Sequence, residues 1–234
     1  MISFVIPAWN EEVLLPRCIN AIHRECEEWV NYEIIVVDNG STDGTASIAK
    51  EMRARVVDEP CKGVTRARQR GLLEAAYNIV AFIDADNEIP AGWAVCAVWA
   101  LHYHGSVAAS GPIIYDELFW PKRVVVSLFY TFARVIHHLA PMLQGGNFIL
   151  RKDSMMKAGG FNTEIDFYGE DTDAAVRLSK VGKLRFELGM WVYSSSRRIS
   201  EEGLARVGSR YIINYAWMWL SGKPWTLKYL DHRD

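Results

Sequence analysis

Residues 79–87 are Ile-Val-Ala-Phe-Ile-Asp-Ala-Asp-Asn, an unbroken apolar run followed by two carboxylates. The run Ile79 to Ile83 predicts a strand that is buried on both faces, as in parallel sheets covered by helices on both sides. Open α/β sheets bind ligands at the carboxyl ends of their strands. Asp84 and Asp86 are therefore expected at the end of the sheet where ligands bind.

The residues before this segment alternate between short apolar runs and helical patterns. Strands are expected at Ile2 to Ile6, Ile34 to Val37 and Val56 to Val57, and helices at about Glu12 to Trp29, Thr45 to Arg53 and Val64 to Tyr77. This order predicts an α/β fold with a Rossmann-like, mostly parallel central sheet flanked by helices.

The residues after this segment are less regular. Aromatic-rich helical patterns cover Val124 to Leu139 and Gly203 to Leu220. Between them, Gly145-Gly146-Asn147 leads into Phe148 to Leu150, and a helix is expected from Glu170 to about Val181. A chain of 234 residues can bury one core, so we expect a single compact domain with two lobes that meet near residue 115.

Composition narrows the classes of function. The chain has 26 basic and 28 acidic residues, so no general basic field is present to bind nucleic acid. The four cysteines form no CxxC pair, and the N-terminus lacks a signal-peptide pattern. We therefore expect reduced thiols, a cytoplasmic location and no nucleic-acid partner.

Asp84 and Asp86 have two interpretations. Carboxylate oxygens suit Mg²⁺ or Mn²⁺, and an ion at this position would neutralise charge on a diphosphate. The alternative is a turn, or a cap for the helix that begins near Pro90.

Two other charged positions near strand ends suit a nucleotide. Asp38 ends the second strand, where a carboxylate can accept hydrogen bonds from a base or a ribose. Arg68 lies in the basic run Lys62 to Arg70 at the start of a helix, where cations oppose the helix dipole. Either diphosphate binding or a solvated basic face would explain that run.

Glu170 and Asp171 follow a glycine at the start of a helix. Their carboxylates suit a helix cap. They equally suit a general base, because transfer to a hydroxyl requires a base within hydrogen-bond reach.

Together these segments resemble the family 2 glycosyltransferases, from Pro7 to about Arg198. The resemblance implies a GT-A fold, with a nucleotide-sugar (donor) lobe at 1–115 and an acceptor lobe at 116–234 that ends in an amphipathic helix. It implies a metal-dependent, inverting transfer of a hexose, with a UDP-sugar as the favoured donor. The acceptor would be a saccharide hydroxyl or a lipid-linked acceptor in polysaccharide or glycolipid synthesis, with Mn²⁺ or Mg²⁺ as cofactor.

The resemblance also implies roles for individual residues. Asp171 would be the catalytic base, with Glu170 beside it, and Asp86 the metal ligand, with Asp84. The donor-binding set would be Pro7, Trp9, Glu11, Asp38, Arg68, Asp84, Ala85, Gly146, Asn147, Arg197 and Arg198. Many relatives have an acidic residue where this chain has Asn87, and tyrosine where it has Trp9.

Other readings of the chain remain open. A nicotinamide-dependent dehydrogenase would also have a parallel sheet. It needs a glycine-rich turn after the first strand, however, and this chain has Pro7 to Asn10 there, which argues against that reading. A catalytically silent nucleotide-sugar-binding module, a nucleotidyltransferase and a polyprenyl-phosphate glycosyltransferase all fit the carboxylates. The aromatic helix that ends near Leu220 suits either core packing or a membrane interface. The second choice predicts a peripheral location on the inner face of the cell membrane.

Overall fold

The computed structural model describes residues 1–26, 31–102, 105–115, 140–165, 169–221 and 225, together with isolated positions from 124 to 137. Its central sheet has seven strands in the order β3-β2-β1-β4-β8-β6-β9. Of these strands β8 alone runs antiparallel to its neighbours, so the predicted α/β fold with a mostly parallel sheet is confirmed. The strands are β1 (Ile2–Ala8), β2 (Tyr32–Asp38), β3 (Arg55–Asp58), β4 (Ile79–Ile83), β6 (Ala108–Ser110), β8 (Asn147–Arg151) and β9 (Leu184–Phe186).

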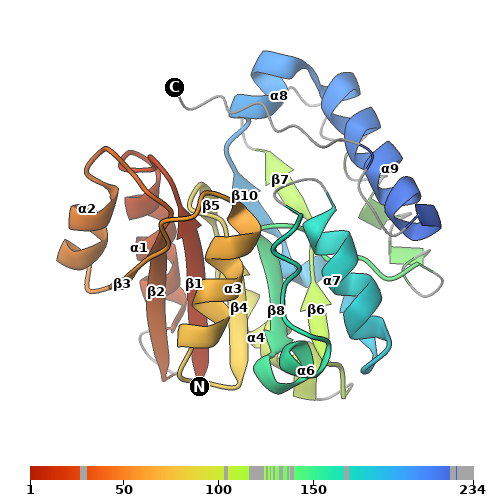
Figure 1. Ribbon diagram of the computed structural model, residues 1–234, viewed down its shortest axis with the longest axis horizontal. Helices are drawn as coiled ribbons and strands as arrows, with labels where there is room; N and C mark the ends of the chain where they lie inside the picture. Colours follow the sequence, from red (N-terminus) through yellow and green to blue (C-terminus); the bar gives the residue numbers. More distant parts are fainter. Residues whose placement is uncertain are drawn as a thin grey trace.

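Helices cover both faces of this sheet (Figure 1). Phe4 and Ile6 of β1 join the core beneath one helical layer, and Val5 joins the core beneath the other, as alternation along a strand requires. The first layer contains α1 (Leu15–Cys26), α2 (Thr45–Glu51) and α4 (Trp93–His102), and the second contains α3 (Val64–Glu74), α6 (Lys152–Lys157) and α7 (Glu170–Ser179).

Close packing of α3 on β1 depends on a glycine. A Cβ atom at Gly71 would lie 2.2 Å from Cγ1 of Val5, so a larger residue would push the helix away from the sheet. This contact matters for the site because α3 also carries Arg68.

A three-stranded sheet in the order β5-β10-β7 lies near the carboxyl ends of the main strands (Figure 1). It consists of β5 (Asn87–Glu88), β10 (Val192–Ser194) and β7 (Ile113–Tyr115), and the short helix η1 (Leu188–Met190) precedes β10. The chain then forms α8 (Arg197–Glu202) and α9 (Leu204–Ser221).

The C-terminal helix α9 packs with one side only. Val207, Asn214 and Met218 are buried, whereas Ile212 and Leu220 are exposed. Membrane contact through the exposed side therefore stays a prediction. Within the described part of the chain, no helix combines the length and the apolar character needed to cross a bilayer.

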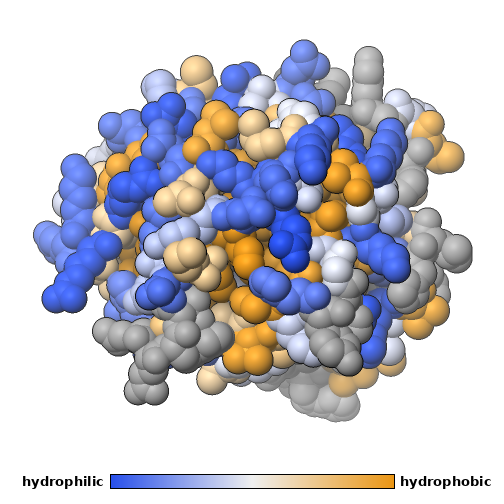
Figure 2. All heavy atoms as spheres, turned by 90° about the horizontal axis from the view of Figure 1, so that it is seen from below, coloured by the Kyte–Doolittle hydropathy of each residue, from blue (hydrophilic) through white to orange (hydrophobic). Residues whose placement is uncertain are grey.

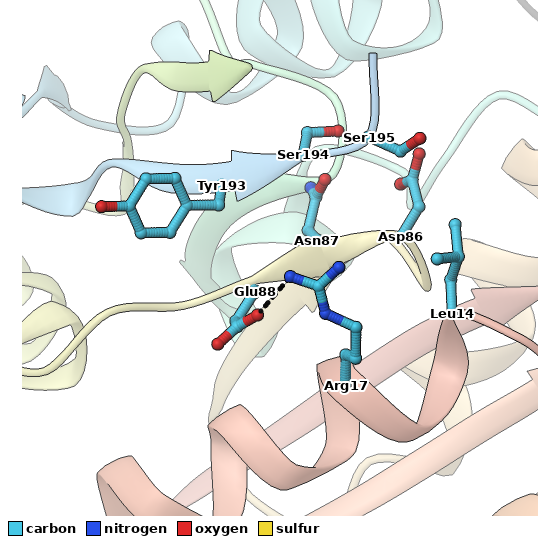
Figure 3. Close-up of a pocket in the computed structure, with 8 residues that line it drawn as sticks. All are labelled: Leu14, Arg17, Asp86, Asn87, Glu88, Tyr193, Ser194 and Ser195. Atoms are coloured by element: carbon cyan, nitrogen blue, oxygen red, sulfur yellow. Dashed lines mark hydrogen bonds and ion pairs between the residues drawn. The ribbon is translucent and has the colours of Figure 1, made fainter. Parts of the chain in front are cut away.

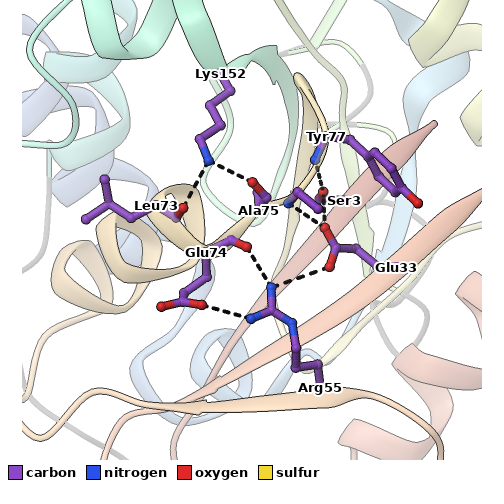
Figure 4. Close-up of polar contacts among 9 residues, drawn as sticks. Ser3, Glu33, Arg55, Leu73, Glu74, Ala75, Tyr77 and Lys152 are labelled. Atoms are coloured by element: carbon purple, nitrogen blue, oxygen red, sulfur yellow. Dashed lines mark hydrogen bonds and ion pairs between the residues drawn. The ribbon is translucent and has the colours of Figure 1, made fainter.

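Two helices are shorter than the sequence pattern predicted, and side-chain hydrogen bonds are found at or near the ends concerned. α3 stops at Glu74 rather than Tyr77 because Lys152 Nζ donates to the carbonyls of Leu73 (3.0 Å) and Ala75 (2.7 Å) (Figure 4). Likewise α1 begins at Leu15 rather than Glu12, whose carboxylate accepts from the amide of Gly44 at 2.7 Å.

The polar network of Figure 4 lies at the amino ends of the strands, at the opposite end of the sheet from Asp84. Glu33 joins three segments there, accepting from Ser3 Oγ (2.5 Å), the amide of Ala76 (2.7 Å) and Arg55 Nη2 (3.4 Å). The molecule seen from this end has a hydrophobic centre with hydrophilic residues around it (Figure 2).

Some predictions fall on residues without a description. The helix predicted from Val124 to Leu139 lies largely outside the described residues, as do 116–123, which follow the predicted lobe boundary. All four cysteines are free, as expected.

Candidate active site

The site forms where β4 ends and β8 begins. Antiparallel pairing places Ile83 opposite Asn147, so the turns that follow β4 and precede β8 meet. The amide of Asp84 donates to the carbonyl of Gly146 at 3.2 Å, and Asn87 Nδ2 donates to the same carbonyl at 2.8 Å. The first carboxylate of the Asp-Ala-Asp segment is thereby fixed against the glycine turn.

Arg68 is the central cation of the site. Its side chain is only 2% exposed, and its guanidinium donates to Asp84 Oδ1 and to Glu170 Oε1, each at 3.0 Å. Burial would lower the pKa of Arg68, but Asp84 and then Glu170 raise it further, so the group stays charged. The alternative of a solvated basic face is therefore wrong for Arg68.

Asp171 lies in the first turn of α7 beside this cluster. Its Oδ2 accepts from the amide of Gly145 at 3.1 Å, and its Oδ1 accepts from the amide of Thr172 at 2.7 Å. Burial and then Glu170 raise the pKa of Asp171 to about 7, against the lowering influence of Arg68 and the two amides. A carboxylate with that pKa can take up a proton near neutral pH.

Asp86 carries the second strongly perturbed carboxylate. Burial raises its pKa to about 7, with further contributions from Asp84 and Glu11, while Arg197 lowers it. Beside Asp86 lies a pocket lined by Leu14, Arg17, Asn87, Glu88, Tyr193, Ser194 and Ser195 (Figure 3). Negative charge is thus concentrated at this end of the site.

The alternative for Asp84 and Asp86 was a turn or a helix cap, and the structure has the turn but not the cap: the amide of Asn87 donates to the carbonyl of Asp84 at 3.0 Å. Glu25 of α1 accepts from the amides of Gly92 and Ala94 at 2.9 Å each, and so caps the start of α4. Sequence reasoning missed this role, although Glu25 interrupts the apolar stripe of α1, where a polar partner should have been sought.

The residues near Asp86 fit a divalent cation. Within the described residues, no group of three His, Cys, Asp or Glu side chains forms a preformed metal cluster. Mg²⁺ is, however, commonly held by one or two carboxylates together with substrate phosphates and water. Burial is the main reason that the pKa of Asp86 is raised, and the negative charges of Asp84 and Glu11, which a cation would offset, add to it.

An ion pair joins the two ends of the sequence at the site. Arg197 Nη2 lies 3.0 Å from Oε1 and 3.1 Å from Oε2 of Glu11, which is 5% exposed. Each residue was predicted to bind donor, but nothing in the pattern indicated that they pair. The side chain of Arg198 lies outside the described ones.

The loops after β1 and β2 carry the residues predicted for the base and ribose. The ammonium group of Lys62 lies 3.8 Å from the ring centroid of Trp9. Asp38 Oδ1 accepts from the amide of Ser41 at 3.0 Å, and Pro7 lies beside Val37 in the sheet register. A planar ring and a carboxylate therefore stand at the ends of adjacent strands.

Several members of the predicted donor set are buried, among them Glu11 and Arg68, which are described above, and Ala85 and Asn147. Ala85 is 4% exposed, so only its backbone can reach a ligand. Asn147 is fully buried, and its amide accepts from Trp93 Nε1 (3.0 Å) and donates to the carbonyls of Pro112 (3.0 Å) and Met190 (2.6 Å). Asn147 therefore supports the glycine turn from behind.

Comparisons with known proteins agree with this arrangement. Residues 3–159 match the family described as Glycosyl transferase family 2. The chain belongs to this family. An uncharacterized glycosyltransferase of Mycobacterium bovis is 43% identical over 91 residues, which cover 39% of each chain. Glycosyltransferase AglE of Haloferax volcanii is 33% identical over 91 residues, covering 36% of this chain and 30% of its own.

Solved structures support the GT-A fold of the family 2 chain. A mannosyltransferase of Pyrobaculum calidifontis, in complex with GDP-Man and Mn²⁺, aligns with a TM-score of 0.76 at 22% identity, covering 95% of this chain and 65% of its own. Glucosyl-3-phosphoglycerate synthase of Mycobacterium tuberculosis, in complex with Mn²⁺ and UDP-glucose, aligns with a TM-score of 0.65 at 24% identity, covering 96% and 80%.

Gly146 gives a test of the glycosyltransferase site. Its φ is +74°, and an added Cβ would lie 2.2 Å from Asp84 Oδ2. Gly146→Ala is expected to displace Asp84 from Arg68 and to lower the free energy of unfolding by about 3 kcal/mol, because the buried guanidinium loses one of its two carboxylate partners. Gly105 has a φ of +61° with open space around it, so Gly105→Ala should cost only about 1 kcal/mol of backbone strain. Equal losses in urea unfolding of the two variants would contradict the close contact.

Proposed function

We propose that the protein is a metal-dependent, inverting glycosyltransferase that moves a hexose from a nucleotide diphosphate sugar, with a UDP-sugar favoured, to a hydroxyl of a saccharide or lipid-linked acceptor. The observation that carries the proposal is the cluster in which the buried Arg68 pairs with Asp84 and Glu170, and the amide of Gly145 donates to Asp171. Asp84 belongs to the Asp-Ala-Asp segment, so the metal-holding role is given to Asp84 and Asp86 and the base role to Asp171. The pKa values of Asp86 and Asp171, both raised to about 7, agree with this division.

The donor half of the mechanism uses the loops at the strand ends. Trp9 and Asp38 would contact the base and the ribose. Asp86, with Asp84, would hold Mn²⁺ or Mg²⁺, and a bound divalent ion supplies charge stabilisation for the departing nucleoside diphosphate. Arg197 is 41% exposed, so it can exchange Glu11 for a donor phosphate oxygen.

The acceptor half uses the first turn of α7. Asp171 would take the proton of the acceptor hydroxyl as its oxygen attacks the anomeric carbon from the side opposite the diphosphate. One displacement forms the new glycosidic bond and breaks the bond to the diphosphate, which inverts the anomeric configuration. Arg68 neutralises Glu170, so Glu170 orients the cluster rather than accepting a second proton.

Donor binding is tested by thermal shift with UDP-, GDP-, dTDP- and CMP-sugars, with and without Mn²⁺ or Mg²⁺. One nucleotide class should stabilise the protein in a metal-dependent way, by about 2.7 kcal/mol at a hundredfold excess over Kd. Folded protein that responds to no donor would contradict the proposal.

Product analysis separates the remaining functions. A glycosyltransferase releases a nucleoside diphosphate and an inverted glycoside, whereas a nucleotidyltransferase releases pyrophosphate. Donor binding without turnover, in the presence of a range of acceptors, would identify a catalytically silent module.

A further inference from the structure

A second pocket, lined by Arg134, His137, Arg185 and Phe186, lies in the C-terminal half of the chain. Arg185 Nε donates to Glu187 Oε1 at 2.5 Å, and its side chain is still 33% exposed. Two arginines and one carboxylate leave a net positive charge among the described side chains of this pocket. Phe186 lies 6.1 Å from the His137 ring and gives the pocket one apolar wall.

This basic pocket lies on the same side of the sheet as the proposed base. Phe186 is in register with Ser110 at the carboxyl end of β6, and Ser110 Oγ accepts from the amide of Gln144 at 2.7 Å. The next amide, that of Gly145, donates to Asp171. A short run of paired and hydrogen-bonded residues therefore links the pocket wall to Asp171.

We propose that the basic pocket binds a phosphate group of the acceptor, with Arg134 and Arg185 as the phosphate-contacting side chains. Guanidinium groups match the geometry of phosphate oxygens and remain charged at all relevant pH values. The donor diphosphate is assigned to Asp86 and Arg197, so this pocket is a separate anion site. The inference rests on the proposed transferase function, because it names the acceptor class for that site.

Exposed apolar side chains occur on α9 and beside Arg134 in the sequence. Tyr215 Oη of α9 donates to the carbonyl of Ala140 at 2.7 Å, which ties α9 to that residue. Val135, next to Arg134, is 67% exposed, and Ile212 and Trp217 of α9 are 55% and 40% exposed. A phosphate attached to a lipid would place its chain along these residues, whereas a soluble phosphorylated acceptor would use the basic pocket alone.

Two probes distinguish the sources of phosphate. Neutral phosphatidylcholine vesicles containing polyprenyl phosphate, or polyprenol as the uncharged control, test the lipid form by co-sedimentation. Glycerol 1-phosphate tests the soluble form by thermal shift. The variants are Arg134→Gln and Arg185→Gln, with Arg206→Gln as the matched control, because Arg206 is an exposed arginine of α9 outside the pocket.

We expect the wild-type protein to bind one of the two probes in a phosphate-dependent way. Arg134→Gln and Arg185→Gln should each weaken this binding by about tenfold or more, because each removes one charge-assisted hydrogen bond. Arg206→Gln should leave the binding unchanged. Equal binding by the wild-type protein and both pocket variants would overturn the proposal, as would an equal loss in Arg206→Gln. Donor thermal shift on the same proteins reports the transferase function independently. A lost donor response with retained phosphate binding would remove the proposed function and leave the anion site.

Discussion

Asp171→Asn is expected to lower the turnover of sugar transfer by about a thousandfold, within the range that general bases contribute, and to leave metal-dependent donor binding unchanged. Asparagine keeps an oxygen that can accept from the amides of Gly145 and Thr172, but it cannot take up the acceptor proton. The measurement is kcat with saturating donor and acceptor, together with the donor Kd. Asp173→Asn is the matched control, because Asp173 lies in the same helical turn and pairs with Arg177.

The pH profile adds an independent readout for Asp171. Its pKa is raised to about 7, so wild-type turnover should fall as the pH drops through 7 and the base becomes protonated. Because the pKa of Asp171 is higher in the folded protein than its ordinary value of 3.8, the ionised form destabilises the fold. This effect is absent below pH 3.8 and complete above pH 7. Asp171→Asn should therefore unfold at pH 8 at no lower temperature than the wild-type protein. Wild-type turnover by folded Asp171→Asn would exclude Asp171 as the base.

Asp86→Ala is expected to weaken donor binding in the presence of Mn²⁺ by about a hundredfold, because a metal bridge to a diphosphate contributes several kcal/mol. Without metal, the variant and the wild-type protein should bind donor equally weakly. Isothermal titration calorimetry with and without Mn²⁺ measures both quantities.

Glu88→Ala is the control for Asp86→Ala. Glu88 lines the same pocket, but its carboxylate pairs with the exposed side chains of Arg17 and Arg24. Exposed ion pairs contribute little to stability, so this variant should stay folded and keep its metal response. An unchanged Mn²⁺ response in Asp86→Ala would remove Asp86 as a metal ligand.

The parallel half of the sheet is predictable from sequence because its strands are buried on both faces. Runs such as Ile79 to Ile83 are apolar at every position, whereas a strand at the surface alternates between apolar and polar residues. Each of these runs is followed by a polar turn. The strand β8 was not predicted, and neither was its antiparallel direction. An apolar pattern alone does not indicate the direction of a strand. The antiparallel direction of β8 is what brings the turn at Gly145 and Gly146 next to Asp84.

The site is less predictable because its contacts join residues far apart in sequence. The position of Arg68 on a helix was predicted, but its burial depends on Glu170, which is 102 residues later. Asn147 was predicted from resemblance to bind the donor, and its support of the glycine turn depends on Trp93, Pro112 and Met190. The roles of individual site residues stay predictions until the variants are measured.

The ion pair between Glu11 and Arg197 can form only late in the synthesis of the chain. Glu11 leaves the ribosome early, with β1, and its partner follows 186 residues later. A nascent chain can form β1 to β4 while the carboxylates around Asp86 still lack that counter-charge. The carboxylates around Asp86 therefore reach their final charge balance only when α8 has been synthesised. A chain shortened before residue 197 would lack the cation that pairs with Glu11 and lowers the pKa of Asp86.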